Sequence, residues 1–358
     1  MLKISQFVKP GVVVGRDLEN IFSFAKEKKF AIPAINCINT DSINAVMEAS
    51  AERRSPVIIQ FSYGGSSFIA GNYFYKNNKY APIIGAISGA MHIINLSKYY
   101  KIPVIINTDH CNKKIIYWLN KILEEEKKYY SLYKKPIFSS HMLDLSKEKL
   151  KNNISISKKY LKITKKLDIN LEIEIGCTGG EEDGVDNSNI KNELLYTNPK
   201  EVFYAYKELN KIGKNFTIAA SFGNVHGVYK KENIKLKPKI LYESQKYVSK
   251  KNFVPKNPIN FVFHGGSGTE EEKIKECIEY GVVKINFDTD IQWSSWIGVL
   301  NFYKKYKDFL HSQIGNPKGK YLPNKKFYDP RSWIRNSQKC VISKLKSIFR
   351  ICNSENFL

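Results

Sequence analysis

Three of the six histidines stand where they could bind one metal ion. His110, His226 and His264 end or follow three separate apolar segments of the chain. Three neutral imidazoles that leave one coordination position open form a common catalytic zinc site. The alternative is that each is a hydrogen-bonded loop histidine, because no short motif such as HExxH brings two imidazoles together. We expect the remaining histidines to be structural, namely His92, His141 and His311.

Carboxylates fall near the same segments. Glu172 and Glu174 are two residues apart in an apolar run, so they share one face of a strand. Buried carboxylates are costly unless they are paired or bind metal. Asp144 and Glu174 are therefore candidates for a second metal position, and a hydrogen-bond network with Lys284 is the alternative.

An acidic loop, CTGGEEDG, covers residues 177–184 and carries Glu181 and Glu182 between glycines that can act as hinges. A mobile lid that closes over a site suits a base whose pKa rises as water leaves. A solvated acidic loop or a calcium-like turn is the alternative interpretation.

The segment 102–110 presents a geometric requirement. Asn107 and Asp109 share one face of a strand there, whereas His110 faces the other. The strand must therefore turn at its end if Asp109 and His110 are to point into one site.

Two glycine-rich or acidic turns are candidates for phosphate binding. HGGSG (264–268) and NFDTD (286–290) each follow an apolar run, and backbone amides in such loops bind phosphate at the mouths of α/β barrels. The segment GNPKGK (315–320) only imitates a P-loop, because its spacing is short, and we interpret it as a turn.

These residues require a scaffold, and the chain supplies eight short apolar runs separated by amphipathic stretches. This alternation predicts parallel strands joined by helices, and eight such units predict a (β/α)8 TIM barrel of class α/β. The predicted strands are 30–37, 55–62, 102–110, 137–144, 169–176, 216–223, 259–266 and 282–290. Polar residues at their C-terminal ends would converge on one mouth: Asn36, Ser62, Asp109, His110, Asp144, Glu174, His264, Asn286 and Asp288.

Helices are predicted where capping residues precede amphipathic stretches, after Thr40 and Asp41, after Ser146 and after Asn198-Pro199. A long insertion, 224–252, would be an active-site loop. We expect one barrel domain over 1–358, whose C-terminal helical extension, 291–358, packs on the barrel or forms a subunit contact.

Composition narrows the function classes. The net charge is +23, from 57 basic and 34 acidic residues, but only six of the basic residues are arginines, so base-specific nucleic-acid reading is disfavoured. The six cysteines form no CxxC pair, which disfavours a disulfide framework. No apolar run is long enough to cross a membrane and no secretory signal opens the chain, so we expect a cytoplasmic protein.

The motifs together resemble the class II, zinc-dependent fructose-bisphosphate aldolases of the bacterial type with a long C-terminal tail. The segments that carry the resemblance cover nearly the whole chain, and the most specific are LEIEIGCTGGEE, NFVFHGGSG and VVKINFDTDIQW. The resemblance implies reversible cleavage of fructose 1,6-bisphosphate to dihydroxyacetone phosphate and glyceraldehyde 3-phosphate in a homodimer.

The resemblance also implies residue roles. His110, His226 and His264 would bind the catalytic Zn²⁺, and Asp144 and Glu174 would form a second metal position. Asp109 would exchange a proton with the aldehyde oxygen, Glu182 would take the proton from dihydroxyacetone phosphate, and Asn286 would stabilise the enediolate. A monovalent cation (K⁺ or Na⁺) would lie near the residues that contact dihydroxyacetone phosphate: Gly227, Gly265, Gly266, Ser267, Asp288 and Thr289. Other substrate positions would be Asn36, Ser62, Arg331 from across a dimer interface and, less centrally, Lys325.

This chain departs from the family at one position. The family shows His-x-Asp-His where this sequence has Asn107-Thr108-Asp109-His110. Asn107 can hydrogen-bond but cannot titrate, so the tuning of Asp109 or of the metal by a histidine is absent.

Alternative functions are compatible with the sequence. Tagatose-1,6-bisphosphate aldolase belongs to the same family and differs in the stereochemistry of one hydroxyl. A Schiff-base aldolase using Lys284, a zinc hydrolase with Glu182 as base and a basic nucleic-acid-binding protein are more distant alternatives.

Overall fold

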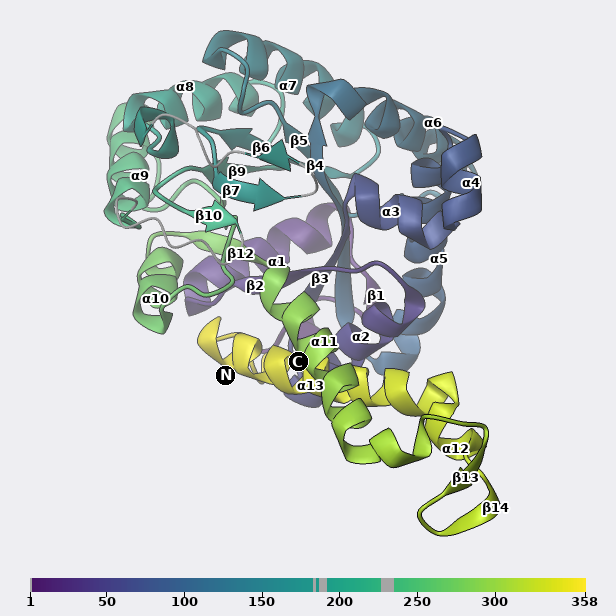
Figure 1. Ribbon diagram of the computed structural model, residues 1–358. Helices are drawn as coiled ribbons and strands as arrows, with labels where there is room; N and C mark the ends of the chain where they lie inside the picture. The colour runs from purple at the N-terminus through teal and green to yellow at the C-terminus, as the bar shows by residue number, and fades with distance from the viewer. Residues whose placement is uncertain (1, 183–184, 187–191, 227–234) are drawn as a thin grey trace.

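The computed structural model describes residues 2–182, 185–186, 192–226 and 235–358. Within them, eight parallel strands close into a barrel in the order β4-β3-β2-β12-β11-β9-β6-β5, and β5 pairs back with β4 (Figure 1). The predicted TIM barrel is therefore confirmed. The strands are β2 (Ile32–Asn36), β3 (Val57–Phe61), β4 (Pro103–Asn112), β5 (Ser140–Asp144), β6 (Asn170–Ile175), β9 (Phe216–Ala220), β11 (Phe261–Phe263) and β12 (Val282–Phe287).

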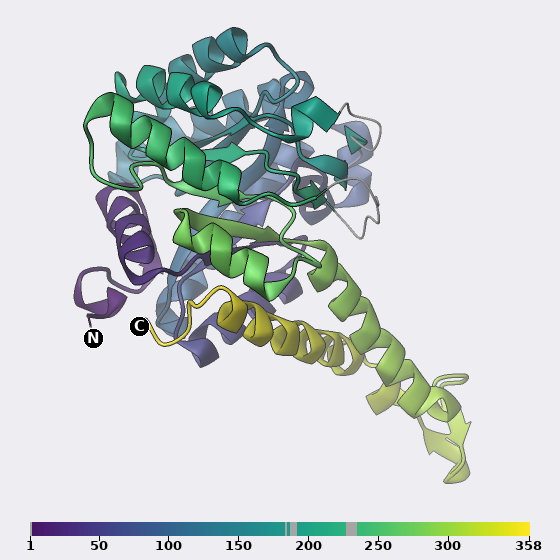
Figure 2. The ribbon, with the colours of Figure 1, turned by 90° about the vertical axis from the view of Figure 1, so that its left-hand side faces the viewer.

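Helices follow the strands and cover the outside of the barrel (Figure 2). The apolar faces of most of these helices pack on the outward side chains of the strands in one continuous core. The helices are α1 (Gly15–Lys28), α2 (Thr40–Arg53), α3 (Tyr63–Ala70), α4 (Asn72–Asn77), α5 (Ala81–Tyr100), α6 (Ile116–Tyr133), α7 (Leu150–Lys165), α8 (Pro199–Asn210), α9 (Lys239–Asn252), α10 (Glu271–Glu279), α11 (Thr289–Tyr306), α12 (Lys325–Tyr328) and α13 (Pro330–Ile351).

The inside of the barrel changes from apolar to polar along the strands. One layer aligns Ala34, Ile58 and Ile105, and these side chains pack in a separate cluster with apolar residues of α1. The next layer toward the strand C-termini aligns Asn36, Gln60 and Asn107. Since side chains alternate along a strand, this register places every inward residue beyond the apolar layer at one mouth of the barrel.

Short strands supplement the barrel. The strand β1 (Gly11–Val12) pairs with the first residues of β4, before β4 reaches β5. A three-stranded sheet over the mouth joins β7 (Gly179–Glu182), β8 (Val185–Asp186) and β10 (Val225–His226). A hairpin, β13 (Ile314–Asn316) and β14 (Gly319–Pro323), contains the turn predicted at 315–320.

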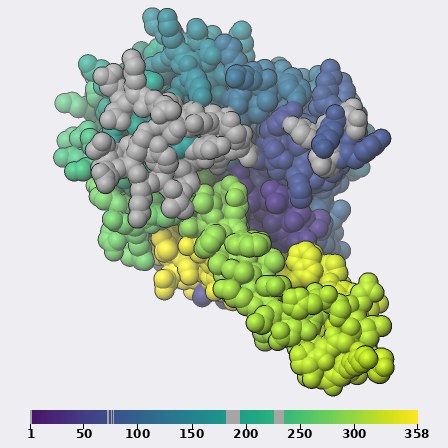
Figure 3. All heavy atoms as spheres, in the orientation of Figure 1, coloured from purple at the N-terminus to yellow at the C-terminus, as the bar shows by residue number. Residues whose placement is uncertain are grey.

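The C-terminal segment forms an arm that projects from the barrel (Figure 3). Helix α13 packs against α11 and α2, and ion pairs from Arg335 to Glu48 and from Lys346 to Glu52 join it to α2. The hairpin lies at the far end of the arm.

Two local predictions were wrong. Ser146 does not begin a helix: α7 starts at Leu150, and the Ser146 side chain donates to Asp144 instead. The stretch 224–252 is not all loop, because its last residues form α9. The helix start at Asn198-Pro199 is confirmed by a capping box with Glu201. None of the described helices is long and apolar enough to span a membrane.

Candidate active site

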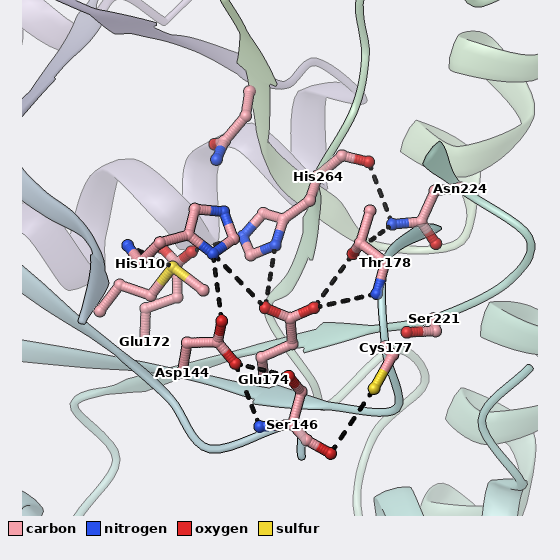
Figure 4. A network of polar contacts seen from close by, with 12 residues as sticks. His110, Asp144, Ser146, Glu172, Glu174, Cys177, Thr178, Ser221, Asn224 and His264 are labelled. Carbon is pink, nitrogen blue, oxygen red and sulfur yellow. Dashed lines mark hydrogen bonds and ion pairs between the residues drawn. The ribbon is translucent and has the colours of Figure 1, made fainter. Parts of the chain in front are cut away.

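Two histidines and a glutamate meet at the C-terminal mouth of the barrel. One ligand atom each from His110, Glu174 and His264 lies within 4.8 Å of the others. Glu174 Oε2 is 3.8 Å from His110 Nδ1 and 3.5 Å from His264 Nδ1 (Figure 4). Two imidazole nitrogens and a carboxylate oxygen are donors that zinc accepts.

The backbone at His110 brings its side chain inward. His110 has φ +48°, a left-handed conformation that is uncommon outside glycine, and the β4–β5 register shifts between Thr108 and Cys111. The amide of His110 donates to Met142 Sδ at 3.3 Å. The turn that the sequence required is therefore present, and Asp109 and His110 both face the mouth.

The two carboxylate oxygens of Glu174 have different surroundings: Oε1 accepts hydrogen bonds, and Oε2 faces two imidazoles. Thr178 donates to Oε1 from its amide and hydroxyl, at 3.3 and 3.0 Å, and Asn224 donates to the Thr178 hydroxyl. Oε2 is buried and makes no hydrogen bond. A buried carboxylate oxygen without a hydrogen-bond donor, facing two imidazoles, fits a metal ligand.

The His264 ring is held from below by a buried ion pair. Its Nε2 lies 2.9 Å from Glu172 Oε1, and Lys284 donates to Glu172 Oε2 at 2.6 Å. Burial alone would lower the pKa of His264, but Glu172 and Glu174 outweigh it and raise that pKa to about 9. Burial would raise the pKa of Glu172, and the charges of Lys284 and His264 instead lower it to about 2.

Asp144 lies beside His110 on the neighbouring strand. Its Oδ2 is 3.4 Å from His110 Nδ1, and Ser146 donates to Oδ1 from its hydroxyl at 2.6 Å. Burial opposes ionisation, yet these contacts hold the pKa of Asp144 well below its ordinary value. Lys284 pairs with Glu172 rather than with Asp144 or Glu174, so the lysine network predicted as the alternative forms one layer deeper.

Asp109 lies in a ring of amides. Its Oδ2 accepts from Asn36 Nδ2 at 3.0 Å and Gln60 Nε2 at 2.9 Å, and Asn286 Nδ2 is 3.5 Å from Oδ1. Asn107 Nδ2 donates to Gln60 Oε1, which orients the Gln60 amide toward Asp109. Asn107 therefore acts on Asp109 through Gln60.

The loops after β11 and β12 lie next to each other. The amide of Gly266 donates to the Asn286 carbonyl, and the Ser267 hydroxyl accepts from the amide of Asp290 at the start of α11. A Cβ on Gly266 would lie 2.5 Å from an Ile285 side-chain carbon, so only glycine fits. Gly265 has φ +75°. Asp288 and Thr289 flank the beginning of α11.

The other predicted residues differ in where they lie. Ser62 directly follows β3, at the C-terminal end of the barrel, and caps α3 by accepting from the amide of Gly65. Arg331 is 90% exposed and pairs with Asp329 on the arm, where α12 begins at Lys325. Gly227 lies outside the described residues, and the side chains of His226 and Glu182 do so as well.

The sequence analysis missed Gln60, Thr178 and Asn224. Gln60 had a signal, because it is the one polar residue in the run VIIQF and shares a strand face with inward residues. Thr178 is only four residues from Glu174, but the turn that brings its hydroxyl back to that carboxylate has no sequence signature that we used. Asn224 donates to the His264 carbonyl, 40 residues away, and no local pattern reveals that contact.

Comparison with known proteins decides the family. The sequence profile of fructose-bisphosphate aldolase class-II matches residues 16–357. The chain belongs to the class-II fructose-bisphosphate aldolase family. It is 60% identical to fructose-bisphosphate aldolase class 2 of Buchnera aphidicola subsp. Schizaphis graminum and 54% identical to that of Escherichia coli K12, over the full length of each.

A solved structure agrees with this assignment. The crystal structure of fructose-bisphosphate aldolase from Campylobacter jejuni superposes with a TM-score of 0.92 at 48% identity, with both chains fully covered. Class-II aldolases are metal-dependent, and the His110, Glu174 and His264 cluster supplies suitable ligands. The family expected from the sequence motifs is confirmed.

Proposed function

We propose that this class-II aldolase reversibly cleaves fructose 1,6-bisphosphate to dihydroxyacetone phosphate and glyceraldehyde 3-phosphate. The observation that carries the proposal is that the His110, Glu174 and His264 cluster shares one barrel mouth with Asp109 in a chain of this family. We further propose the cytoplasm as its location, because these substrates belong to central sugar metabolism.

Zn²⁺ is the metal that we assign to this site. His110 and His264 would hold it together with His226, and Glu174 Oε2 and Asp144 would offer a second position. The buried Oε2 without a hydrogen bond is the observation that supports this fit. When bound, the ion supplies Lewis-acid chemistry that withdraws electrons from a substrate carbonyl.

Asp109 is proposed to exchange the proton of the aldehyde oxygen. The amide groups of Asn36 and Gln60 fix its carboxylate, so a substrate hydroxyl meets an oriented acceptor rather than a rotating one. Glu182, at the end of β7, is proposed to take the proton from dihydroxyacetone phosphate. Asn286 would donate to the negative charge that develops on the substrate.

The phosphate of dihydroxyacetone phosphate is proposed to bind the loops after β11 and β12. Gly265 and Ser267 lie on either side of Gly266, whose own amide bonds to the Asn286 carbonyl and joins the two loops. Helix α11 begins at Thr289, where its dipole favours an anion. Gly227 and Asp288 would complete the subsite, and a monovalent cation (K⁺ or Na⁺) would balance the charge.

A homodimer is proposed through the projecting arm. Trp293 and Trp296 on α11 are 62% and 54% exposed, and Tyr321 on the hairpin is 81% exposed. Exposed aromatic residues in one region are typical of protein interfaces. Arg331, also on the arm, would reach the second phosphate in the partner's site, with Lys325 nearby.

A coupled assay for triose phosphate release tests the function. We expect cleavage of fructose 1,6-bisphosphate, loss of activity with EDTA, recovery with Zn²⁺ and no inactivation by borohydride plus substrate. Preference for tagatose 1,6-bisphosphate would overturn the substrate assignment. Trapping by borohydride would instead indicate a Schiff base at Lys284.

A further inference from the structure

A second pocket lies at the opposite end of the barrel from the active site. It has a volume of about 780 Å³ and is formed by the last turns of α1, the start of β9 and the segment 254–260 that leads into β11. These are N-terminal strand ends, whereas the metal ligands lie at the C-terminal ends. Small-molecule sites in proteins commonly have volumes of this order.

The pocket carries an excess of unpaired positive charge. Among the described residues, Lys26, Lys214 and Lys256 line it without an ion pair. The lining acids are mostly used, since Glu279 pairs with Lys29 at 2.8 Å and Glu27 pairs with Lys28 at 2.6 Å. Glu19 alone among the described lining carboxylates has no cationic partner. Such a balance favours an anionic ligand.

Lys26 and Asn260 offer complementary polar groups in this pocket. The Lys26 ammonium donates to the Asn257 carbonyl at 3.0 Å, which uses one of its three hydrogens. Burial lowers the pKa of Lys26 to about 8. Asn260 Oδ1 is buried without a hydrogen-bond partner. A ligand with an acceptor for Lys26 and a donor for Asn260 would satisfy both groups.

We propose that this pocket binds a small phosphorylated polyol or sugar, whose phosphate contacts Lys26 and whose hydroxyl donates to Asn260 Oδ1. Lys214 and Lys256 add attraction for the phosphate from the rim. Tyr206 and Phe216 form an apolar wall for the carbon chain. Their rings pack edge to face, with the ring centroids 6.0 Å apart. The site is separate from the catalytic phosphate loops.

The test must report on Lys26 alone, because the active site also attracts phosphates. The zinc-loaded enzyme is treated with limiting acetic anhydride, and acetylation of individual lysines is followed by peptide mass spectrometry. The neutral amine attacks one carbonyl, forms an amide and releases acetate and a proton. Exposed Lys151, which has no ion pair among the described contacts, is the internal control.

Glycerol 3-phosphate at saturation should slow acetylation of Lys26 about fivefold or more relative to sodium chloride of equal ionic strength. Inorganic phosphate should protect at higher concentration, glycerol should not protect, and Lys151 should be unaffected in every arm. Equal slowing of Lys26 and Lys151, or no slowing of Lys26, would overturn the proposal.

The variant Asn260→Leu separates the two contacts. It should reduce protection by glycerol 3-phosphate to the level given by inorganic phosphate, because the acceptor for the hydroxyl is gone. Full protection in a variant with unchanged circular dichroism would contradict the Asn260 assignment. The variant Lys26→Met should keep kcat/KM for aldol cleavage, so the result is independent of the catalytic proposal.

Discussion

His264 and His141 are both fully buried, and their surroundings shift the two pKa values in opposite directions. His264, on the inner side of the barrel, contacts Glu172 and Glu174, and its pKa rises to about 9. His141, on the outer side of β5, has Thr108 Oγ1 2.9 Å from Nδ1, and burial lowers its pKa to about 3.

The carboxylate near His141 explains the difference. Glu126 Oε1 is 3.9 Å from His141 Nε2, but the amides of Ile137 and Phe138 already occupy both carboxylate oxygens. Burial raises the pKa of Glu126 to about 7 despite these bonds. Equal burial therefore yields a cation-stabilising site on the inner face and a neutral structural site on the outer face.

Replacing each histidine by glutamine gives the largest contrast. His264→Gln should lower kcat/KM about a thousandfold, because a proposed metal ligand is lost. His141→Gln should lower Tm and leave metal affinity, measured by chelator competition, unchanged. Comparable loss of metal from both variants would remove the distinction between the two sites.

Breaking the ion pair beneath His264 should have the next largest effect. Glu172→Gln leaves Lys284 buried without its carboxylate and should cost about 3–5 kcal/mol of unfolding free energy in urea. Glu126→Gln on the outer face should cost less, because no lysine loses its partner there. If the double variant Glu172→Gln/Lys284→Met is no more stable than Glu172→Gln alone, the unpaired charge of Lys284 is not the cause of the destabilisation.

Glu126 and His141 should contribute to the pH dependence of the unfolding free energy with opposite signs, and single substitutions should reveal each contribution. The pKa of Glu126 rises from 4.5 to about 7 on folding, so its contribution to stability is lost as pH rises through this range. The pKa of His141 falls from 6.5 to about 3, so its contribution grows as pH rises to 6.5.

Between pH 4.5 and 6.5 each of the two groups changes the unfolding free energy by about 2 kcal/mol, and the two changes nearly cancel in the parent protein. Relative to the parent, Glu126→Gln should gain stability with rising pH and His141→Gln should lose it, as measured by urea unfolding at several pH values. Slopes of the same sign in both variants would be inconsistent with these shifts.

The smallest effect is expected at Thr108, the neighbour of Asp109. Thr108→Val removes the contact with His141 and should cost about 1 kcal/mol in unfolding free energy. Because Thr108 faces outward, kcat/KM should change less than about twofold. A larger loss of activity would mean that the outer face influences Asp109 directly.

The barrel was predictable because its strands are short, apolar and regularly spaced, and Glu172 and Glu174 were assigned one face from their spacing alone. The sequence showed that His110 must turn inward but not how it does so, since a left-handed conformation at a non-glycine residue depends on contacts such as Met142 Sδ. Ser146 was misinterpreted because a capping residue and a partner for Asp144 look identical in sequence.

The pairing of Gln60 with Asp109 and of Asn224 with the His264 carbonyl joins residues far apart in the chain. Such contacts follow from the closed barrel and not from local periodicity. The roles proposed for the remaining site residues were predicted from the family resemblance, and substitutions at those residues test them.

The left-handed backbone at His110 couples two tasks through one peptide unit. Asp109 and His110 are consecutive, so any displacement of the proposed metal ligand His110 also displaces the carboxylate that we propose to exchange the proton. A change of aldehyde specificity that leaves both groups in place would therefore be sought in loops that follow other strands.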